Sequence, residues 1–341
     1  MRENQGQYGH MASLVASLKE RYSVFMRAIV FDTFGGPDVL HLREVTLPEP
    51  GPGQVRVAIL AAGTNPVDAG NRQDGSWAGL HLPVIPGYDA SGVIDAIGPG
   101  VTLFAPGDEV FYMANFPNNS RGTYAEYQVV DAALIARKPQ TLTHVEAAAL
   151  PLAGGTAYET IIRRLALSQG EWVLMYGAAG GVGSLALQMA VAQGAQVIAV
   201  ARAHHHELLS ELGAVACLDY TTQDVQASAQ TIAGRKLDAS ADFVGGETLA
   251  QSFGAIRPYG RAASIAGVRG ELDQLLDLNL TFHGILVRPE QTRLAALDLL
   301  VSTGALRPII DQVLPLEEAA QAHRRLESGH GQGKVVLSVH E

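Results

Sequence analysis

The sequence predicts an α/β protein that combines a mostly β, barrel-like N-terminal region with a doubly wound parallel sheet. First, short apolar runs alternate with Gly- and Pro-rich turn signals between residues 26 and 150. Second, strand-like and helix-like patterns alternate from residue 151 onward, which is typical of a parallel sheet flanked by helices. Third, residues 171–202 contain a strand pattern, a glycine-rich turn, a helix pattern and a second strand pattern.

The N-terminal region begins with a strand-like segment at residues 26–31. Three further short strands are expected at Val55–Ala61, Gly92–Ile97 and Glu109–Tyr112. Turn signals separate them at Gly35–Pro37, Pro50–Gly53 and Pro106–Asp108. Short strands at this spacing are typical of a small barrel.

The second region is expected to hold the strands of the parallel sheet, which are Trp172–Tyr176, Gln196–Ala201, Val215–Leu218, Leu237–Val244, Arg261–Ala266 and Leu280–Leu286. Helices are expected between them, at His204–Leu212, Thr222–Ala233 and Thr248–Ile256. The tail repeats helix, strand, helix and strand, at Gln291–Ser302, Ile309–Leu314, Leu316–Glu327 and Lys334–Val339. We expect this tail to return to the first domain. The predicted domains are therefore residues 26–150, completed by residues 289–341, and residues 151–288.

The turn after the first parallel strand carries the pattern Ala178-x-Gly180-x-x-Gly183. Ala178 suits the tight turn, Gly180 lets the backbone approach a pyrophosphate, and Gly183 lets helix and strand pack closely. The helix N-terminus that follows offers free N–H groups and a partial positive charge to the phosphates. The segment therefore predicts a dinucleotide site, with Gly181 and Val182 in the same loop. Ser184 either adds a hydroxyl to the pyrophosphate site or caps the helix.

The residue at the end of the second strand indicates which dinucleotide binds. NAD-specific folds place Asp or Glu about 20 residues after the loop, on the ribose 2′-hydroxyl. Here the strand ends at Arg202, and the next acid along the chain is Glu207. A guanidinium suits a 2′-phosphate, which a carboxylate would repel. The sequence thus predicts NADP(H) rather than NAD(H).

Composition excludes several classes of function. The net charge of −10 argues against nucleic acid or an anionic membrane as the main partner, and no apolar run is long enough for a membrane helix. The single cysteine, Cys217, excludes intrachain disulfides and a cysteine-rich zinc site, and we expect it buried in a strand. The first 25 residues lack the features of a secretory signal. We expect them to be a flexible extension, or Met26 to be the natural start, and we expect a cytoplasmic protein.

Six motifs, including the glycine-rich turn, occur along the chain in a specific order. They are Met26–Pro37 (MRAIVFDTFGGP), Gly63–Asp68 (GTNPVD), Pro86–Gly92 (PGYDASG), Gly107–Val110 (GDEV), Gly122–Tyr127 (GTYAEY) and Ala178–Ser184 (AAGGVGS). In this order they resemble the medium-chain dehydrogenase/reductase superfamily, and most of all its zinc-independent quinone oxidoreductase branch, the family of zeta-crystallin. The resemblance covers residues 26–341. It implies a GroES-like catalytic domain, a Rossmann domain and a homodimer.

The branch is indicated by the residues at the positions of the catalytic zinc ligands. Zinc alcohol dehydrogenases of this superfamily have a cysteine where this chain has Asn65, and a His-Glu pair where it has Tyr88-Asp89. Zinc prefers thiolate and imidazole ligands, so the resemblance implies that no metal is bound here. It implies hydride transfer from NADPH to quinones or conjugated carbonyls. An alkenal or enone double-bond reductase, or a non-enzymatic structural or RNA-binding relative, remains an alternative.

The resemblance also implies two catalytic residues. The Asn65 amide would donate to the acceptor oxygen, although a turn residue before Pro66 would look the same. Thr156 matches a threonine near the nicotinamide, or is a plain helix N-cap. Asp68 is expected to hold the loop, and Gly70 stands where many relatives have a tyrosine.

Further cofactor contacts are implied by the resemblance. Tyr220 matches a tyrosine near the adenosine 2′-phosphate, with a surface aromatic as the alternative. Backbone at the ends of two strands would hold the nicotinamide, at Gly245, Ala266 and Gly267. Lys334 matches a lysine near the cofactor cleft, with an exposed strand-start charge as the alternative.

Two segments receive other interpretations. The run His204–His206 is expected to be a solvated helix start rather than a metal site, because consecutive helical side chains diverge. The strand Leu280–Leu286 is expected to pair with its twin in a homodimer, since an uncovered sheet edge is an aggregation risk.

Overall fold

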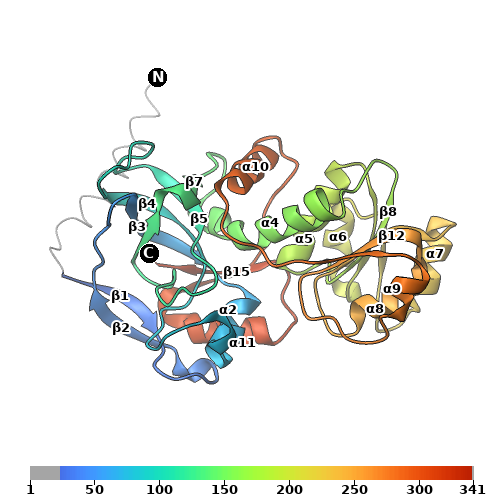
Figure 1. The fold of residues 1–341 in the computed structure, drawn as a ribbon, viewed down its shortest axis with the longest axis horizontal. Helices are drawn as coiled ribbons and strands as arrows, with labels where there is room; N and C mark the ends of the chain where they lie inside the picture. Colours follow the sequence, from blue (N-terminus) through green and yellow to red (C-terminus); the bar gives the residue numbers. More distant parts are fainter. Residues whose placement is uncertain (1–23, 340–341) are drawn as a thin grey trace.

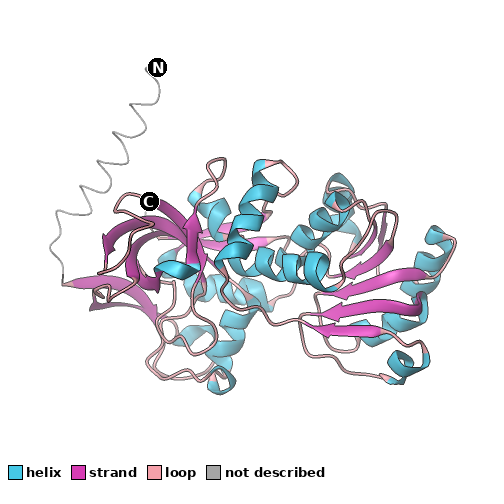
Figure 2. Cartoon of the chain, turned by 45° about the horizontal axis from the view of Figure 1, so that its top comes forward, coloured by secondary structure: helices cyan, strands magenta, loops and turns pink. Residues whose placement is uncertain are grey.

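The computed structural model describes residues 24–339, so the expected extension at residues 1–25 lies almost wholly outside the described residues. Two large sheets lie at opposite ends of the long axis, and helices α4 (Pro151–Tyr158) and α10 (Gln291–Ser302) lie between them (Figure 1). Figure 2 shows the same arrangement, with strands at both ends and helices concentrated between and around them. The protein is thus an α/β fold with one mainly antiparallel and one parallel sheet.

The first sheet combines strands from both ends of the chain. Within the described residues its order is β14-β15-β3-β4-β5-β7, with β6 paired to β3. The bounds are β3 (Gln54–Gly63), β4 (Asp89–Ile97), β5 (Glu109–Met113), β6 (Tyr127–Asp131), β7 (Ile135–Arg137), β14 (Ile310–Pro315) and β15 (Lys334–Ser338). A separate antiparallel pair is formed by β1 (Phe25–Val30) and β2 (His41–Thr46). Short helices α2 (Pro66–Gln73) and α3 (His144–Ala148) complete the N-terminal part.

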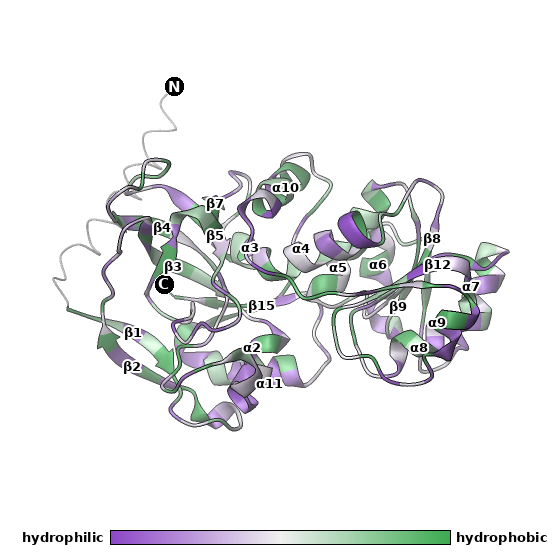
Figure 3. Ribbon diagram, viewed as in Figure 1, coloured by the Kyte–Doolittle hydropathy of each residue, from purple (hydrophilic) through white to green (hydrophobic). Residues whose placement is uncertain are grey.

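Close packing explains the small residues in the central strands. A methyl group on Gly92 of β4 would lie 2.0 Å from the carbonyl oxygen of Ala58 on β3, so only glycine fits there. The apolar side chains of β3 are largely buried, and Figure 3 shows this strand in hydrophobic colours while α11 (Ala319–Glu327) is mainly hydrophilic. The strands therefore pair tightly, and most side chains of β3 are buried between its neighbours and the rest of the core.

The second sheet is entirely parallel, with the order β10-β9-β8-β11-β12-β13. Its strands are β8 (Trp172–Tyr176), β9 (Gln196–Val200), β10 (Ala216–Leu218), β11 (Leu237–Asp242), β12 (Ile256–Ser264) and β13 (Thr281–Gly284). Its helices are α5 (Gly181–Ala192), α6 (His206–Glu211), α7 (Val225–Ala233), α8 (Thr248–Ser252) and α9 (Asp273–Asp277). The chain adds strands outward from β8 to β10 on one side of the sheet and from β11 to β13 on the other, so the strand order reverses between β8 and β11. This is the doubly wound arrangement, in which ligands bind beyond the carboxyl ends of the strands at the switch point.

The tail crosses back to the first sheet. After α10, β14 pairs with β15 in parallel, and β15 pairs antiparallel with β3. The Arg72 side chain of α2 binds Glu327 of α11, so the tail helix is fixed to the N-terminal region. We retain residues 26–150 with 289–341, and residues 151–288, as the proposed domain limits.

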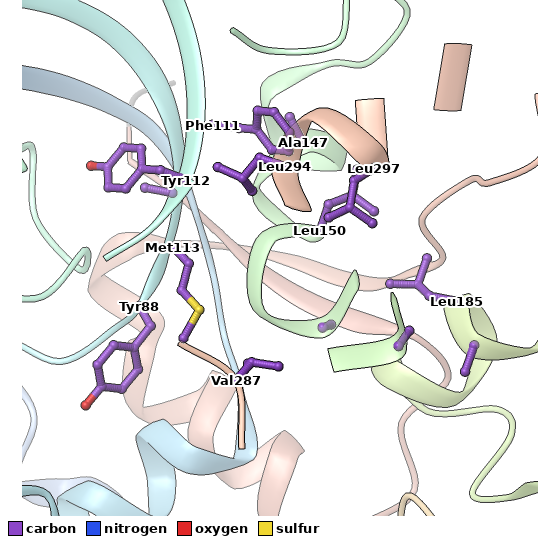
Figure 4. Close-up of a cluster of buried hydrophobic side chains, with 14 of the residues drawn as sticks. Tyr88, Phe111, Tyr112, Met113, Ala147, Leu150, Leu185, Val287, Leu294 and Leu297 are labelled. Atoms are coloured by element: carbon purple, nitrogen blue, oxygen red, sulfur yellow. The ribbon is translucent and has the colours of Figure 1, made fainter. Parts of the chain in front are cut away.

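One apolar cluster ties the two regions together (Figure 4). It unites Phe111 of β5, Leu185 of α5, Leu294 and Leu297 of α10, and Val287 of the connecting segment. A shared core of this kind resists independent motion of the two sheets.

Several element boundaries differ from the predictions. Helix α4 and the π-helical turn Glu159–Arg164 that follows it were not predicted, and the sequence of α4 lacks an amphipathic period. Strand β13 covers only Thr281–Gly284 of the expected Leu280–Leu286. Within the described residues, no helix is both long and apolar enough to cross a membrane.

Candidate functional site

The glycine-rich turn lies at the carboxyl end of β8. Gly180 precedes α5 with an extended backbone, and Gly183 sits in the first turn of the helix. A methyl group on Gly183 would lie 2.2 Å from the carbonyl oxygen of Gly177, so this residue permits the close helix–strand contact that its position requires. A methyl group on Gly180 would meet nothing closer than 3.4 Å, so the space beside this backbone is open. The turn therefore fits a dinucleotide pyrophosphate at the N-terminus of α5.

Ser184 lies within α5, not at its cap. Its side chain is buried, and among the described residues its hydroxyl has no hydrogen-bond partner. The alternative that Ser184 caps the helix is therefore wrong, because Gly180 occupies the cap position. A buried hydroxyl without a partner beside the turn is consistent with a ligand oxygen there.

The two residues expected at the 2′-phosphate lie together. Arg202 follows β9, and its Nε donates to the Tyr220 hydroxyl over 3.1 Å. Arg202 is exposed, and Tyr220 is 53% exposed. Sequence reasoning missed Asp219, whose carboxylate accepts from the Ala203 N–H over 2.9 Å. The pairing of β10 with β9 brings this acid, 16 residues farther along the chain than Ala203, beside the end of β9.

The histidine run is partly buried. His204 is exposed, but His205 is buried and its Nδ1 lies 3.2 Å from Gln332 Oε1. His206 bonds the carbonyl oxygen of Ala201. The expected solvated helix start is thus wrong for His205, because the 3₁₀ turn Ala203–His205 rotates its ring toward the tail. Among the residues that the structure describes, no group of three or more His, Cys, Asp or Glu side chains could hold a metal ion.

A buried polar cluster lies where the tail meets the end of β3. Asn65, which precedes α2, donates from Nδ2 to Asp89 Oδ2 over 3.0 Å. The Lys334 ammonium donates to Asn65 Oδ1 and, over 2.6 Å, to the carbonyl oxygen of Thr64. Its nitrogen lies 3.5 Å from Asp89 Oδ2, while Asp89 Oδ1 accepts from the Leu152 N–H of α4. The cluster therefore joins β15, α2, β4 and α4.

Lys334 is only 5% exposed, so the alternative of an exposed strand-start charge is wrong. The strand β15 is anchored beside the dinucleotide turn, because the Gly333 N–H donates to the carbonyl oxygen of Ala179 over 2.9 Å. The lysine stem lies so close to Gly181 that a methyl group there would be 2.7 Å from Cδ. The aliphatic part of the Lys334 side chain thus lies against the glycine-rich turn, whereas its ammonium group points to Thr64 and Asn65.

Asp68 holds the loop. Its Oδ2 accepts from the Asn65 N–H over 2.7 Å and from the Tyr124 hydroxyl over 3.1 Å. Burial, opposed by the Asn65 N–H bond, raises the pKa of Asp68 to about 7. Its Oδ1 has no partner among the described residues, and Asp68 lines a small cavity together with Asn71 and Tyr88.

Thr156 is interior to α4. Its hydroxyl donates to the Leu152 carbonyl oxygen over 2.7 Å, one turn earlier in the helix. The N-cap alternative is therefore wrong, since Leu150 precedes the helix and Pro151 opens it. Thr156 is 6% exposed and lies one helical turn after Leu152, whose N–H donates to Asp89.

The protein backbone that is expected to hold the nicotinamide lies just after the ends of β11 and β12. The Gly246 N–H donates to the carbonyl oxygen of Gly267 over 2.9 Å. A methyl group on Gly245 would lie 2.7 Å from Cβ of Ala266, so the two loops touch. These loops border the switch point beside β8.

The positions of the family's catalytic zinc ligands carry a different chemistry. Asn65 and Asp89 bind each other and surround an ammonium, and the Tyr88 hydroxyl accepts from Asn71 over 2.7 Å. Amide, phenol and an engaged carboxylate around a cation are a poor zinc donor set.

Cys217 is half-buried in β10, with Sγ 3.7 Å from the carbonyl oxygen of His206.

Comparisons with known proteins agree with this layout. Residues 51–140 match the model of the alcohol dehydrogenase GroES-like domain, and residues 212–337 match that of the zinc-binding dehydrogenases. Human quinone oxidoreductase is 30% identical over 92% of this chain and 97% of its own length. The chloroplastic NADPH-dependent alkenal/one oxidoreductase of Arabidopsis thaliana is 33% identical over 92% of this chain and 79% of its length.

A solved structure has the same fold. The crystal structure of an NAD-dependent alcohol dehydrogenase superposes with a TM-score of 0.87 at 35% identity, covering 92% of this chain and all of that one. The chain belongs to the medium-chain dehydrogenase/reductase superfamily, as an oxidoreductase of the quinone oxidoreductase-like group that uses a nicotinamide cofactor.

Proposed function

We propose that this protein is an NADPH-dependent, zinc-independent oxidoreductase that transfers hydride to quinones or related conjugated carbonyl compounds. One observation carries the proposal. Lys334 runs along the dinucleotide turn at Gly181 and ends on Asn65, at the position where zinc-dependent relatives bind metal. The buried Lys334 side chain therefore connects the proposed cofactor site with the Asn65 amide, a polar group suited to bind a carbonyl oxygen.

The cofactor, when bound, supplies the hydride. Ala178, Gly180, Gly181, Val182, Gly183 and Ser184 would bind its pyrophosphate, and Gly245, Ala266, Gly267 and Thr156 would hold the nicotinamide. Quinones and enones accept hydride without a metal because the negative charge spreads onto oxygen. The protein then mainly positions donor and acceptor and excludes water.

Arg202 and Tyr220 support NADPH over NADH. The guanidinium uses Nε on the Tyr220 hydroxyl, which leaves the two terminal nitrogens for a 2′-phosphate. Asp219 supports the opposite preference, because a carboxylate beside the ribose favours a free 2′-hydroxyl. Its oxygens are engaged by the Ala203 and Thr221 N–H groups and the Thr221 hydroxyl, so we assign the dominant influence to Arg202.

A second candidate is reduction of an alkenal or enone double bond. The Arabidopsis relative carries this activity in its name. At Gly70 this chain lacks the tyrosine of many quinone oxidoreductases, and a methyl group there would meet nothing within 4 Å. Open space at this position favours a different acceptor shape.

The decisive experiment follows NADPH oxidation by absorbance with a benzoquinone, a naphthoquinone, an alkenal and a simple ketone, and repeats each assay with NADH. We expect quinone turnover and preference for NADPH. Turnover of the alkenal alone would establish the second candidate, and ketone turnover dependent on added zinc would contradict the proposal. Tight NADPH binding without turnover of any acceptor would support a non-enzymatic relative.

The remaining proposals concern assembly and location. We propose a homodimer paired through β13, which forms the edge of the parallel sheet within the described residues. Phe282 on this strand is 41% exposed and Leu286 just beyond it is 60% exposed. We propose a cytoplasmic location and neither nucleic acid nor membrane as partner. Sedimentation with and without a Phe282→Lys substitution tests the dimer.

A further inference from the structure

The Asn65 amide is held at both ends by groups of opposite charge. Its oxygen accepts from the Lys334 ammonium, and its nitrogen donates one hydrogen to Asp89 over 3.0 Å. A primary amide carries two N–H bonds. Among the described residues, only Asp89 accepts from this amide nitrogen. The second N–H of Asn65 therefore has no protein acceptor among the described residues.

The ammonium changes the strength of that remaining donor. A positive charge bonded to an amide oxygen draws electron density from the nitrogen and strengthens its N–H groups as donors. The effect is not diluted by water, because Asn65 is 2% exposed and Lys334 is 5% exposed. Asp89 fixes the amide plane through its own bond and is itself held by the Leu152 N–H.

Lys334 has no hydrogen left for a cofactor phosphate. Its three N–H bonds match three acceptors, namely the Thr64 carbonyl oxygen, Asn65 Oδ1 and Asp89 Oδ2 at 3.5 Å. The ammonium is thus committed to the Asn65 cluster, and only the lysine stem lies along the dinucleotide turn.

We propose that Lys334 and Asp89 are positioning residues that orient and polarise the Asn65 amide, whose free N–H stabilises the negative charge on the acceptor oxygen during hydride transfer. The inference rests on the proposed function. The acceptor gains a hydride, NADPH becomes NADP⁺, and the electron pair displaced from the conjugated system reaches the acceptor oxygen, which then takes a proton from water. The buried ammonium supplies, through an amide, the positive potential that a metal ion supplies in zinc-dependent relatives.

The first test is a double-mutant cycle with Lys334→Met and Asn65→Ala. Loss of one oxyanion donor typically lowers kcat by about 10²- to 10³-fold, and we expect each single variant to approach this loss. In the Asn65→Ala background, Lys334→Met should lower kcat by less than about threefold, because its target is gone. The dissociation constant of NADPH, measured by fluorescence, should stay within about threefold in both single variants. A tenfold weaker NADPH complex with unchanged kcat, or two losses that multiply, would overturn the proposal.

Two further variants separate charge from folding. Lys334→Met/Asp89→Asn removes both charges together and should fold even if the lysine variant alone does not, because Asp89 is then not left as a buried carboxylate without its ammonium. It should retain the kcat loss. Lys138→Met is the matched control, because the Lys138 side chain is also only 6% exposed and pairs with Glu109 and the Pro139 and Leu142 carbonyl oxygens, away from Asn65. It should lower thermal stability and leave kcat within about twofold of wild type.

A measurement without turnover distinguishes failure of this inference from failure of the proposed function. 4-Nitrophenol changes its absorption when it ionises, so its pKa can be read while it is bound with NADP⁺. The wild type should lower that pKa relative to free 4-nitrophenol, and Lys334→Met should abolish most of the shift. Turnover in the wild type without a pKa shift would reject the Asn65 role alone. A shift that survives Lys334→Met would reject the role of the lysine.

Discussion

The two ends of the proposed site are built on opposite physical principles. The dinucleotide end is made of backbone and small residues around Gly180 and Gly183, and it closes with the exposed pair Arg202 and Tyr220. The acceptor end is a buried cluster of charges and amides centred on Asn65. Backbone geometry and a flexible cation tolerate change around them, whereas a buried charge depends on each partner. The comparison predicts steep losses at the acceptor end and graded losses at the dinucleotide end.

The largest effect is expected from Asp89→Ala. This change leaves the Lys334 ammonium buried without its carboxylate and removes the acceptors of the Asn65 amide and the Leu152 N–H. Breaking a buried pair by removing one partner costs about 3–5 kcal/mol. Urea unfolding, followed by circular dichroism, measures the loss.

The matched control is Asp38→Ala. Asp38 pairs with Arg324 at the surface and its side chain is 87% exposed, so its loss should cost about 1 kcal/mol or less. Equal losses for the two variants would show that burial does not set the strength of the acceptor-end cluster.

The next effect concerns Asp68 and pH. Burial raises the pKa of Asp68 from 3.8 to about 7, so the folded protein binds its proton more tightly than the unfolded chain. This contribution to stability is fully present below pH 3.8 and is lost as the pH rises toward 7. Asp68→Asn cannot titrate, so its stability relative to wild type should increase over that range, by at most about 4 kcal/mol.

Unfolding free energies of both proteins across the range measure this difference. The asparagine can still accept from the Asn65 N–H and the Tyr124 hydroxyl, which preserves the loop. A difference that stays constant with pH would show that Asp68 is ionised throughout.

The same contrast explains what the sequence predicts well. The strands β8 and β9 were predicted because each is an apolar run bounded by turn residues, and Trp172–Tyr176 matches β8 at both ends. The glycine-rich turn before α5 was predicted because its glycines are close in sequence. Helix α4 was missed because it is almost uniformly apolar and small, without a polar face.

The acceptor cluster could not be derived in this way. Asn65 and Lys334 are 269 residues apart, and only the pairing of β15 with β3 brings them together. The burial of His205 and the approach of Asp219 to Ala203 likewise depend on tertiary contacts. Resemblance to a family supplied the candidate residues, but not the bonds between them.

A smaller loss is expected from Gly183→Ala. The added methyl group would lie 2.2 Å from the Gly177 carbonyl oxygen, so the turn or the helix must shift. We expect NADPH to bind about tenfold more weakly, which corresponds to about 1.4 kcal/mol of binding free energy. The buried cluster around Asn65 should change little. Isothermal titration with NADPH measures the affinity.

The control for the glycine is Gly36→Ala, where a methyl group meets nothing within 4 Å and the backbone has φ of −71°. It should leave NADPH affinity unchanged. Wild-type affinity in Gly183→Ala would mean that the close contact behind the turn is not needed to form the cofactor site.

The smallest effects are expected at the exposed end of the cofactor site. Arg202→Ala removes the cation proposed for the 2′-phosphate, and an exposed charge-assisted contact of this kind contributes about 1 kcal/mol. NADPH affinity should fall about fivefold while NADH affinity stays constant, and Tyr220→Phe, which removes the hydroxyl bonded to Arg202 Nε, should lower NADPH affinity by less. Titrations with both cofactors at low and high salt measure the difference, which salt should reduce because the contact is exposed. Equal losses for NADPH and NADH would contradict the assignment, because Arg202 would then act on a group that both cofactors carry rather than on the 2′-phosphate.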